Sequence, residues 1–250
     1  MKSASVSKPL KTFYDEYYGA DYTTDGRLDL RWLDSFDKAR NITSLCDTVQ
    51  HARILDIGCG DGAVLKRLSD EEFGRQFYGL EISPTGLALT KKRAIKNLVE
   101  CKLYDGYQIP YGDDQFDLAV LSHVVEHLEH PRMLLREARR VATHVFLEVP
   151  LEDHLRQKRD YFSTDDVEGH INPYSLKTVR WLVQTCGFEI VRQTVTIPSF
   201  EVYHRKMGAK MFFLYPPFKL AGQLVPGVAT KIFTYHCAIL CRRAPSSSRA

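Results

Sequence analysis

The chain contains no pair of cysteines in the CxxC spacing that redox and metal-binding motifs use. Its six cysteines are far apart, and several lie within apolar runs. We therefore expect buried, unpaired thiols in a reducing compartment. These residues are Cys46, Cys59, Cys101, Cys186, Cys237 and Cys241.

Two further absences concern secretion and membranes. Residues 1–12 contain no apolar core of the kind that a secretory signal needs, so we expect a cytoplasmic protein. The most apolar later stretch, residues 211–229, is interrupted by Pro216, Pro217, Lys219 and Pro226. It is therefore not expected to form a membrane-spanning helix.

Acidic residues are absent from residues 202–250, which contain eight basic residues. Because the whole chain carries a net charge of +3, residues 1–201 carry a net charge of −5. This asymmetry indicates that the two parts face different partners, or that the C-terminal part faces something anionic.

The most informative stretch that is present is residues 53–65, RILDIGCGDGAVL. An apolar strand pattern ends in three alternating glycines, and a helical pattern follows. Such a turn lets a ligand approach the backbone amides closely. The spacing is G-x-G-x-G rather than the dinucleotide G-x-G-x-x-G, and Asp56 and Asp61 would repel a pyrophosphate. A cationic nucleoside cofactor is therefore favoured.

This stretch resembles the first motif of class I S-adenosylmethionine (SAM) methyltransferases, hydrophobic-x-D-x-G-C-G-x-G. The resemblance implies SAM as the cofactor, held by Asp56, Gly58, Cys59 and Gly60. It also implies an α/β fold: a Rossmann-like seven-stranded sheet of order 3-2-1-4-5-7-6, its last strand antiparallel and helices on both faces. We assign this domain to residues 51–243, a chain length that suits one sizeable core.

Two acids follow at the ends of predicted strands. Glu81 closes the strand predicted at 76–82, about 20 residues beyond the glycines, where nucleotide folds place an acid that accepts from the ribose hydroxyls. Ile82 lies beside it. In a run resembling the family's "D-x-x-x-hydrophobic-P-aromatic", Asp105 is implied to accept from the adenine amino group, with Gly106 beside the ring.

An aromatic helix over residues 8–19, within an N-terminal cap predicted at 1–50, resembles the family's "YDxYY" segment over the cofactor. The resemblance implies that Tyr14 and Tyr18, with Tyr17 and Tyr22, line the pocket mouth. The alternative is that these aromatics only pin a terminal helix to the core.

The strand predicted at 116–121 leads into Ser122 and His123, and residues 126–131 resemble the "EHLxxP" signature of a methyltransferase group that includes quinone-precursor and small-metabolite enzymes. Ligands bind at the carboxyl ends of such strands, so Ser122 contacts the cofactor and His123 stands near the transferred methyl group. If the segment is helical, His123, Glu126 and His127 share one face and form an alternative metal site. We expect no metal, because the related metal-binding pattern has glutamate in the first position.

Residues 151–173 follow the fifth strand and are predicted to form a substrate lid that contains His154, Asp165, Asp166 and His170. His170 is either a second catalytic base or an organiser of the lid. Ser175 is the expected N-cap of the next helix.

Residues 197–232 form an apolar, basic insert where the plain fold needs only a short hairpin. Such a segment suits peripheral contact with a membrane or a lipid-linked substrate, or packing on the core or in a homodimer. Residues 244–250 are expected to be disordered.

The leading functional hypothesis is methyl transfer from SAM to an oxygen or nitrogen of a small or lipid-linked metabolite. A SAM-binding module without catalysis is the second hypothesis. Nucleic-acid methylation is the third; no nucleic-acid partner is expected, because the Asn/Asp-Pro-Pro-aromatic motif is missing after the fourth strand.

Overall fold

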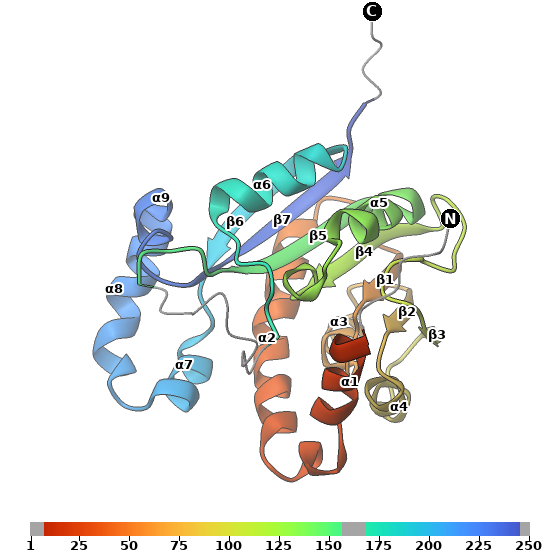
Figure 1. Ribbon diagram of the computed structural model, residues 1–250, viewed down its shortest axis with the longest axis horizontal. Helices are drawn as coiled ribbons and strands as arrows, with labels where there is room; N and C mark the ends of the chain where they lie inside the picture. Colours follow the sequence, from red (N-terminus) through yellow and green to blue (C-terminus); the bar gives the residue numbers. More distant parts are fainter. Residues whose placement is uncertain (1–7, 157–168, 246–250) are drawn as a thin grey trace, which may run out of the picture.

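The computed structural model describes residues 8–156 and 169–245. Its centre is a seven-stranded sheet of order β3-β2-β1-β4-β5-β7-β6 (Figure 1), as predicted. The strands β1 to β5 run parallel, and β7 is antiparallel to both of its neighbours. Their bounds are β1 Arg53–Ile57, β2 Gln76–Glu81, β3 Leu98–Leu103, β4 Phe116–Ser122, β5 Ala142–Leu151, β6 Phe188–Thr196 and β7 Tyr235–Arg243.

Helices cover both faces of the sheet, which explains why the central strands are apolar on both sides. One face packs against α2 (Arg27–Cys46), α3 (Ala63–Asp70) and α4 (Pro84–Lys92) through side chains such as Ile42, Leu65 and Leu87. The other packs against α5 (Pro131–Val141) and α6 (Leu176–Thr185), with Leu134 and Val179 buried. Ser175 caps α6, accepting from the Thr178 amide.

The chain between 123 and 141 does not form one helix, so the prediction that His123, Glu126 and His127 share a helical face is wrong. His123 directly follows β4 and has a φ of 58°, in the left-handed region. A single 3-10 turn, η2 (Val125–His127), follows, and Leu128 is extended. α5 begins only at Pro131, whose ring disfavours helical backbone at the residue before it.

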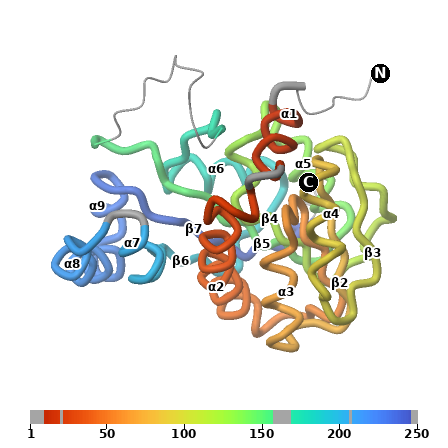
Figure 2. The backbone as a smooth tube through the Cα atoms, turned by 90° about the horizontal axis from the view of Figure 1, so that it is seen from below, coloured from red at the N-terminus to blue at the C-terminus, as the bar shows by residue number. Residues whose placement is uncertain are grey.

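The N-terminal segment forms α1 (Lys8–Tyr17) and the 3-10 turn η1 (Ala20–Thr23). The insert forms α7 (Phe200–Met207), α8 (Met211–Leu224) and α9 (Pro226–Ala229), which lie on the opposite side of the molecule from β3 (Figures 1 and 2). α8 continues through Pro216 and Pro217. None of the helices in the described ranges is long and apolar enough to cross a membrane.

Three further predictions concern the cysteines, the lid and the C-terminal tail. All six cysteines lie within it and are buried free thiols, as expected. Asp165 and Asp166 of the predicted lid lie outside the described residues, as do 246–250 of the predicted tail. Ala244, the first tail residue, is held in place because its amide donates to the Gly187 carbonyl at 3.0 Å.

Candidate functional site

The glycine loop joins β1 to α3 with Gly58, Gly60 and Gly62 all in the left-handed region (φ 79°, 59° and 77°). Side chains disfavour this conformation, which explains the three glycines. The loop is tied to β2 because the amides of Gly58 and Cys59 donate to the Leu80 carbonyl, at 2.7 and 3.0 Å. It is thus fixed at the carboxyl edge of the sheet.

Glu81 lies at the carboxyl end of β2, as predicted, and its carboxylate is held by three backbone amides. Oε2 accepts from Gly60 at 2.7 Å, and Oε1 accepts from Ile82 and Ser83 at 2.9 Å each. Burial raises the pKa of Glu81, and these amides oppose that rise because they favour the charged form. A carboxylate has about four acceptor positions, so beside the three amides Glu81 retains about one for a ligand's hydroxyl group.

A cavity opens between this edge, α1 and α2, and encloses about 500 Å³ with its mouth included. Seven of the predicted residues line it: Tyr14, Tyr18, Gly58, Glu81, Ile82, Ser122 and His123. The other lining residues are Leu10, Arg31, Tyr104, Val124, His127 and Leu128.

A smaller adjoining cavity is lined by the predicted residues Asp56 and Cys59, together with Lys38. It shares Arg31, Gly58 and Ser122 with the first cavity. Burial raises the pKa of Asp56 to about 7.

Asp105 and Gly106 do not line either cavity. Asp105 Oδ1 turns back to accept from the amides of Tyr107 (2.8 Å) and Gln108 (2.7 Å), which is the behaviour of a turn residue. It lines a neighbouring surface hollow that shares Tyr104 with the first cavity. Gly106 supplies the positive φ (90°) of that turn. Their contact with adenine stays a prediction.

The aromatic residues of the N-terminal segment divide between the two expected roles. Tyr14 and Tyr18 line the cavity, with ring centroids 6.1 Å apart. Tyr22 is fully buried, and its hydroxyl donates to Asp61 Oδ2 at 2.9 Å. Tyr22 therefore pins the segment to the glycine loop, whereas α1 covers the cavity.

Arg31 was not predicted as a site residue. It lies on α2, lines both cavities and donates to the Tyr18 hydroxyl at 3.3 Å. Its guanidinium gives the site a cation suited to a carboxylate. Nothing in the sequence distinguishes this arginine from others on a predicted amphipathic helix.

His123 stands at the carboxyl end of β4 because its amide continues the ladder to the Glu148 carbonyl at 2.9 Å. Its Nδ1 lies 3.3 Å from Glu126 Oε1. Its Nε2 is buried and has no hydrogen-bond partner among the described residues. Burial lowers the pKa of His123 well below its usual value, with Lys38 adding to the effect, so the imidazole is neutral at physiological pH.

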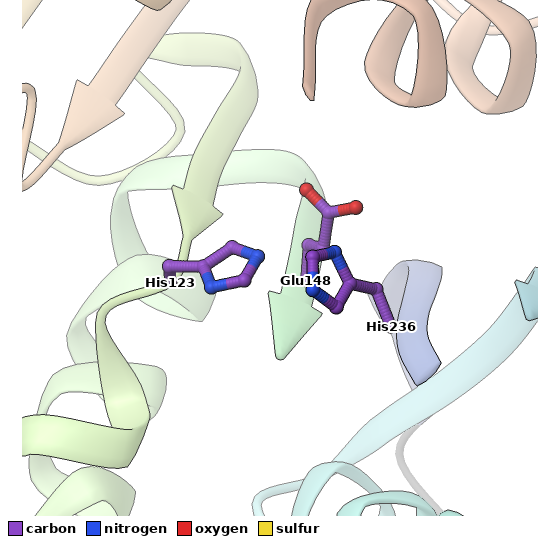
Figure 3. A group of neighbouring side chains, drawn as sticks. All are labelled: His123, Glu148 and His236. Atoms are coloured by element: carbon purple, nitrogen blue, oxygen red, sulfur yellow. The ribbon is translucent and has the colours of Figure 1, made fainter. Parts of the chain in front are cut away.

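His236 and Glu148 lie next to His123, from β7 and β5 (Figure 3). The two imidazole rings are 4.6 Å apart and edge-to-face. Glu148 is buried, accepts from Asn41 Nδ2 at 2.6 Å and from the Ser122 hydroxyl at 2.9 Å, and burial raises its pKa to about 7. Sequence reasoning missed His236 and Glu148, because 113 and 25 residues separate them from His123.

Potential metal ligands are grouped differently from the predicted trio. His123, Glu148 and His236 form one group and Glu126, His127 and His170 another, each with its ligand atoms within 4.8 Å of one another. The structure thus puts His123 in a different group of potential ligands from Glu126 and His127, although His123 still contacts Glu126. Two histidines and a carboxylate are a ligand set that suits several transition metals.

His170 lies beside η2 rather than in either cavity. Its Nδ1 is 2.9 Å from Glu152 Oε2, and its ring is 4.7 Å from that of His127. The amides of Ile171 and Asn172 both donate to the Glu126 carbonyl at 2.9 Å. This placement supports the organising role over the catalytic one.

A sheet of this order, with a glycine loop after β1 and a buried acid at the end of β2, is the arrangement of the Rossmann-like SAM methyltransferase class. A family model described as a methyltransferase domain matches residues 31–193, and the chain belongs to the class I SAM-dependent methyltransferases. S-adenosylmethionine is its methyl donor.

Curated relatives match only in part. A probable tocopherol O-methyltransferase from Oryza sativa subsp. japonica is 27% identical over 52% of this chain and 36% of its own length. Ajmaline N-methyltransferase from Rauvolfia serpentina is 32% identical over 36% of this chain and 32% of its own length. The chain thus spans about a third of the length of these relatives.

Solved structures share the fold at low identity. The Haemonchus contortus phosphoethanolamine N-methyltransferase 2, solved with phosphomonomethylethanolamine and S-adenosylhomocysteine, has a TM-score of 0.67 at 17% identity. The alignment covers 94% of this chain and 61% of that one. A [4+2]-cyclase has a TM-score of 0.60 at 16% identity, covering 83% and 80%. The fold therefore serves more than one reaction.

Proposed function

We propose that this methyltransferase transfers the methyl group of SAM to an oxygen or nitrogen of a small or lipid-linked metabolite, with His123 receiving the acceptor's proton. The observation that carries this proposal is the position of His123, which lines the cavity at the carboxyl end of β4 and has an Nε2 without a hydrogen-bond partner among the described residues. The names of two relatives specify O- and N-methylation, which supports the same two acceptor atoms.

The cofactor's parts match groups along the cavity. Glu81 accepts from the ribose hydroxyls, and Asp105 takes the adenine amino group where its turn borders Tyr104. Arg31 pairs with the carboxylate of the methionine moiety, because it is the cation that lines both cavities. The wall behind the methionine moiety is formed by Asp56, Gly58, Cys59 and Gly60. Tyr14 and Tyr18 cover the site.

The reaction is an in-line displacement at the methyl carbon. The acceptor lone pair forms the new bond, the carbon–sulfur bond breaks, and its electron pair stays on the sulfur of S-adenosylhomocysteine. The proton of a phenol, alcohol or amine passes to His123 Nε2, while Glu126 Oε1 lies 3.3 Å from the other ring nitrogen, Nδ1. Alignment of the two reactants contributes about 7–11 kcal/mol to lowering the barrier.

His123→Asn tests this role, since the base is lost but the side chain stays polar. We expect turnover to fall about a hundredfold or more while the affinity for SAM stays within about twofold. The assay follows S-adenosylhomocysteine formed with a panel of small phenols and amines and with the same groups on lipid chains. SAM affinity is measured by calorimetry.

His130→Asn is the matched control, because His130 is exposed and directly precedes α5, outside the cavity. Full turnover in His123→Asn would refute the base. Loss of turnover after chelation, restored by a divalent metal, would assign His123 to metal binding instead. If the wild type binds SAM but methylates no acceptor in the panel, the binding-module alternative is favoured.

A further inference from the structure

Helix α8 is apolar on two opposite faces. Met211, Tyr215, Phe218 and Gly222 recur at helical spacing and face the protein, with Met211 and Gly222 buried. Residues 213, 217, 220 and 224 recur at the same spacing on the outer side and are all exposed. Packing on the core accounts for the first stripe only.

The outer stripe belongs to a larger apolar surface, which we call the insert face. Phe213 is 85% exposed and Leu224 70% exposed, and both are large side chains in contact with water. The insert face continues onto the end of α8 and onto α9. It comprises Phe212, Phe213, Pro217, Leu220, Leu224, Val225 and Val228. Contiguous exposed apolar surface of this kind marks an interaction site.

The charged residues of α8 and those directly flanking α8 and α9 in the sequence are all basic. Lys210 precedes α8, Lys219 lies on its exposed side and Lys231 follows α9, and all three are exposed. No acidic residue occurs between 202 and 250. A second copy of the chain would bring the same three lysines to a two-fold contact, where they would repel one another. A layer of lipid phosphates would attract them.

Helix α8 packs against the first residue of β7, the strand that carries His236. Tyr235, the first residue of β7, donates its hydroxyl to the Phe218 carbonyl at 2.8 Å. Its ring packs against Gly222, where an added Cβ would lie 2.5 Å from Tyr235 Cε1. The next residue of β7 is His236, beside His123. Because successive side chains of a strand point to opposite faces of the sheet, Tyr235 contacts α8 on one face and His236 contacts His123 on the other.

We infer that the insert face docks the protein onto an anionic lipid bilayer, with α8 lying in the plane of the interface. The outer apolar stripe enters the boundary between headgroups and acyl chains, and the lysines contact lipid phosphates. This inference goes beyond the proposed methyl transfer, because it holds whether or not His123 is the base.

Vesicle co-sedimentation of the full chain tests the inference. We expect binding to phosphatidylcholine vesicles that contain about a third phosphatidylglycerol, and about tenfold weaker binding to pure phosphatidylcholine. Raising the salt concentration from about 0.05 to about 0.5 M should weaken binding, because screening shortens the reach of the lysines.

The double variant Leu220→Glu/Leu224→Glu should lower the bound fraction about tenfold or more. The matched control is Val99→Glu on the edge strand β3, where Val99 is 52% exposed on the opposite side of the molecule (Figure 1). Circular dichroism checks that each variant is folded. The inference is overturned if the wild type does not bind anionic vesicles, or if the double variant binds them as well as the wild type does. It is also overturned if sedimentation shows a dimer that only the double variant abolishes.

Discussion

The carboxylate of Glu81 connects the glycine loop to the candidate site. It accepts from the amide of Gly60 and from those of Ile82 and Ser83, so the acid for the ribose also fixes the loop beneath it. Removing its side chain would therefore affect both ligand binding and the loop. A variant test has to separate these two effects.

Glu81→Ala is expected to weaken SAM binding about a hundredfold or more, because hydrogen bonds to a charged acceptor contribute roughly 1.5–3 kcal/mol each. Glu81→Gln keeps an acceptor near the loop amides but loses the charge, and we expect an intermediate loss. Calorimetric titration measures both, and Glu100→Gln on β3 serves as the control. An unchanged affinity in Glu81→Ala would remove this residue from the site.

The connection between β4 and α5 shows how a distant segment shapes a turn. Asn172 lies 44 residues beyond Leu128, and its Nδ2 donates to the Leu128 carbonyl at 2.6 Å. The same amide group reaches the Val125 carbonyl at 3.3 Å. Asn172 therefore holds η2 in place, and η2 carries Glu126 next to His123.

Asn172→Ala should lower the free energy of unfolding by about 1–2 kcal/mol, because carbonyls of η2 lose their donor. Urea denaturation followed by circular dichroism measures this change. Gln184→Ala, on the exposed side of α6, is the control and should stay within about 0.5 kcal/mol of the wild type. Equal stability of Asn172→Ala and the wild type would show that η2 holds without this side chain.

The elements that could be predicted are those with a local signal. Apolar runs and glycines indicated the strands, and the strand order followed from the family resemblance. The conformation of His123 has no such signal, because a histidine with positive φ is fixed by its surroundings. Arg31, Glu148 and His236 reach the site only through tertiary packing. On α8, apolar residues on every side concealed which face is buried.

Over the whole molecule, buried carboxyl groups make stability depend on pH. Asp56, Glu126 and Glu148 each have a pKa raised to about 7, with burial as the largest cause. Lys38 partly opposes the rise at all three. The native protein thus retains protons that the unfolded chain releases at lower pH.

For Asp56, the native state keeps its proton up to about pH 7, whereas the unfolded chain releases it near 3.8. Stability from this group therefore falls as pH rises between these values. We expect a lower Tm at about pH 8 than at about pH 5.5, and a smaller difference in Asp56→Asn. Calorimetric scans without cofactor measure both proteins. An equal difference in the two proteins would contradict the raised pKa of Asp56.

Pro216 and Pro217 limit how deep α8 can sit. A proline has no amide hydrogen, so neither residue can donate to the carbonyl four positions earlier, at Phe212 and Phe213. Both of these residues are exposed, so water or a headgroup donor can reach carbonyls that lose these bonds. The helix would therefore stay in the hydrated headgroup layer of a bilayer and would not insert more deeply. Such shallow contact is reversible, which would let the protein leave the lipid surface after each encounter.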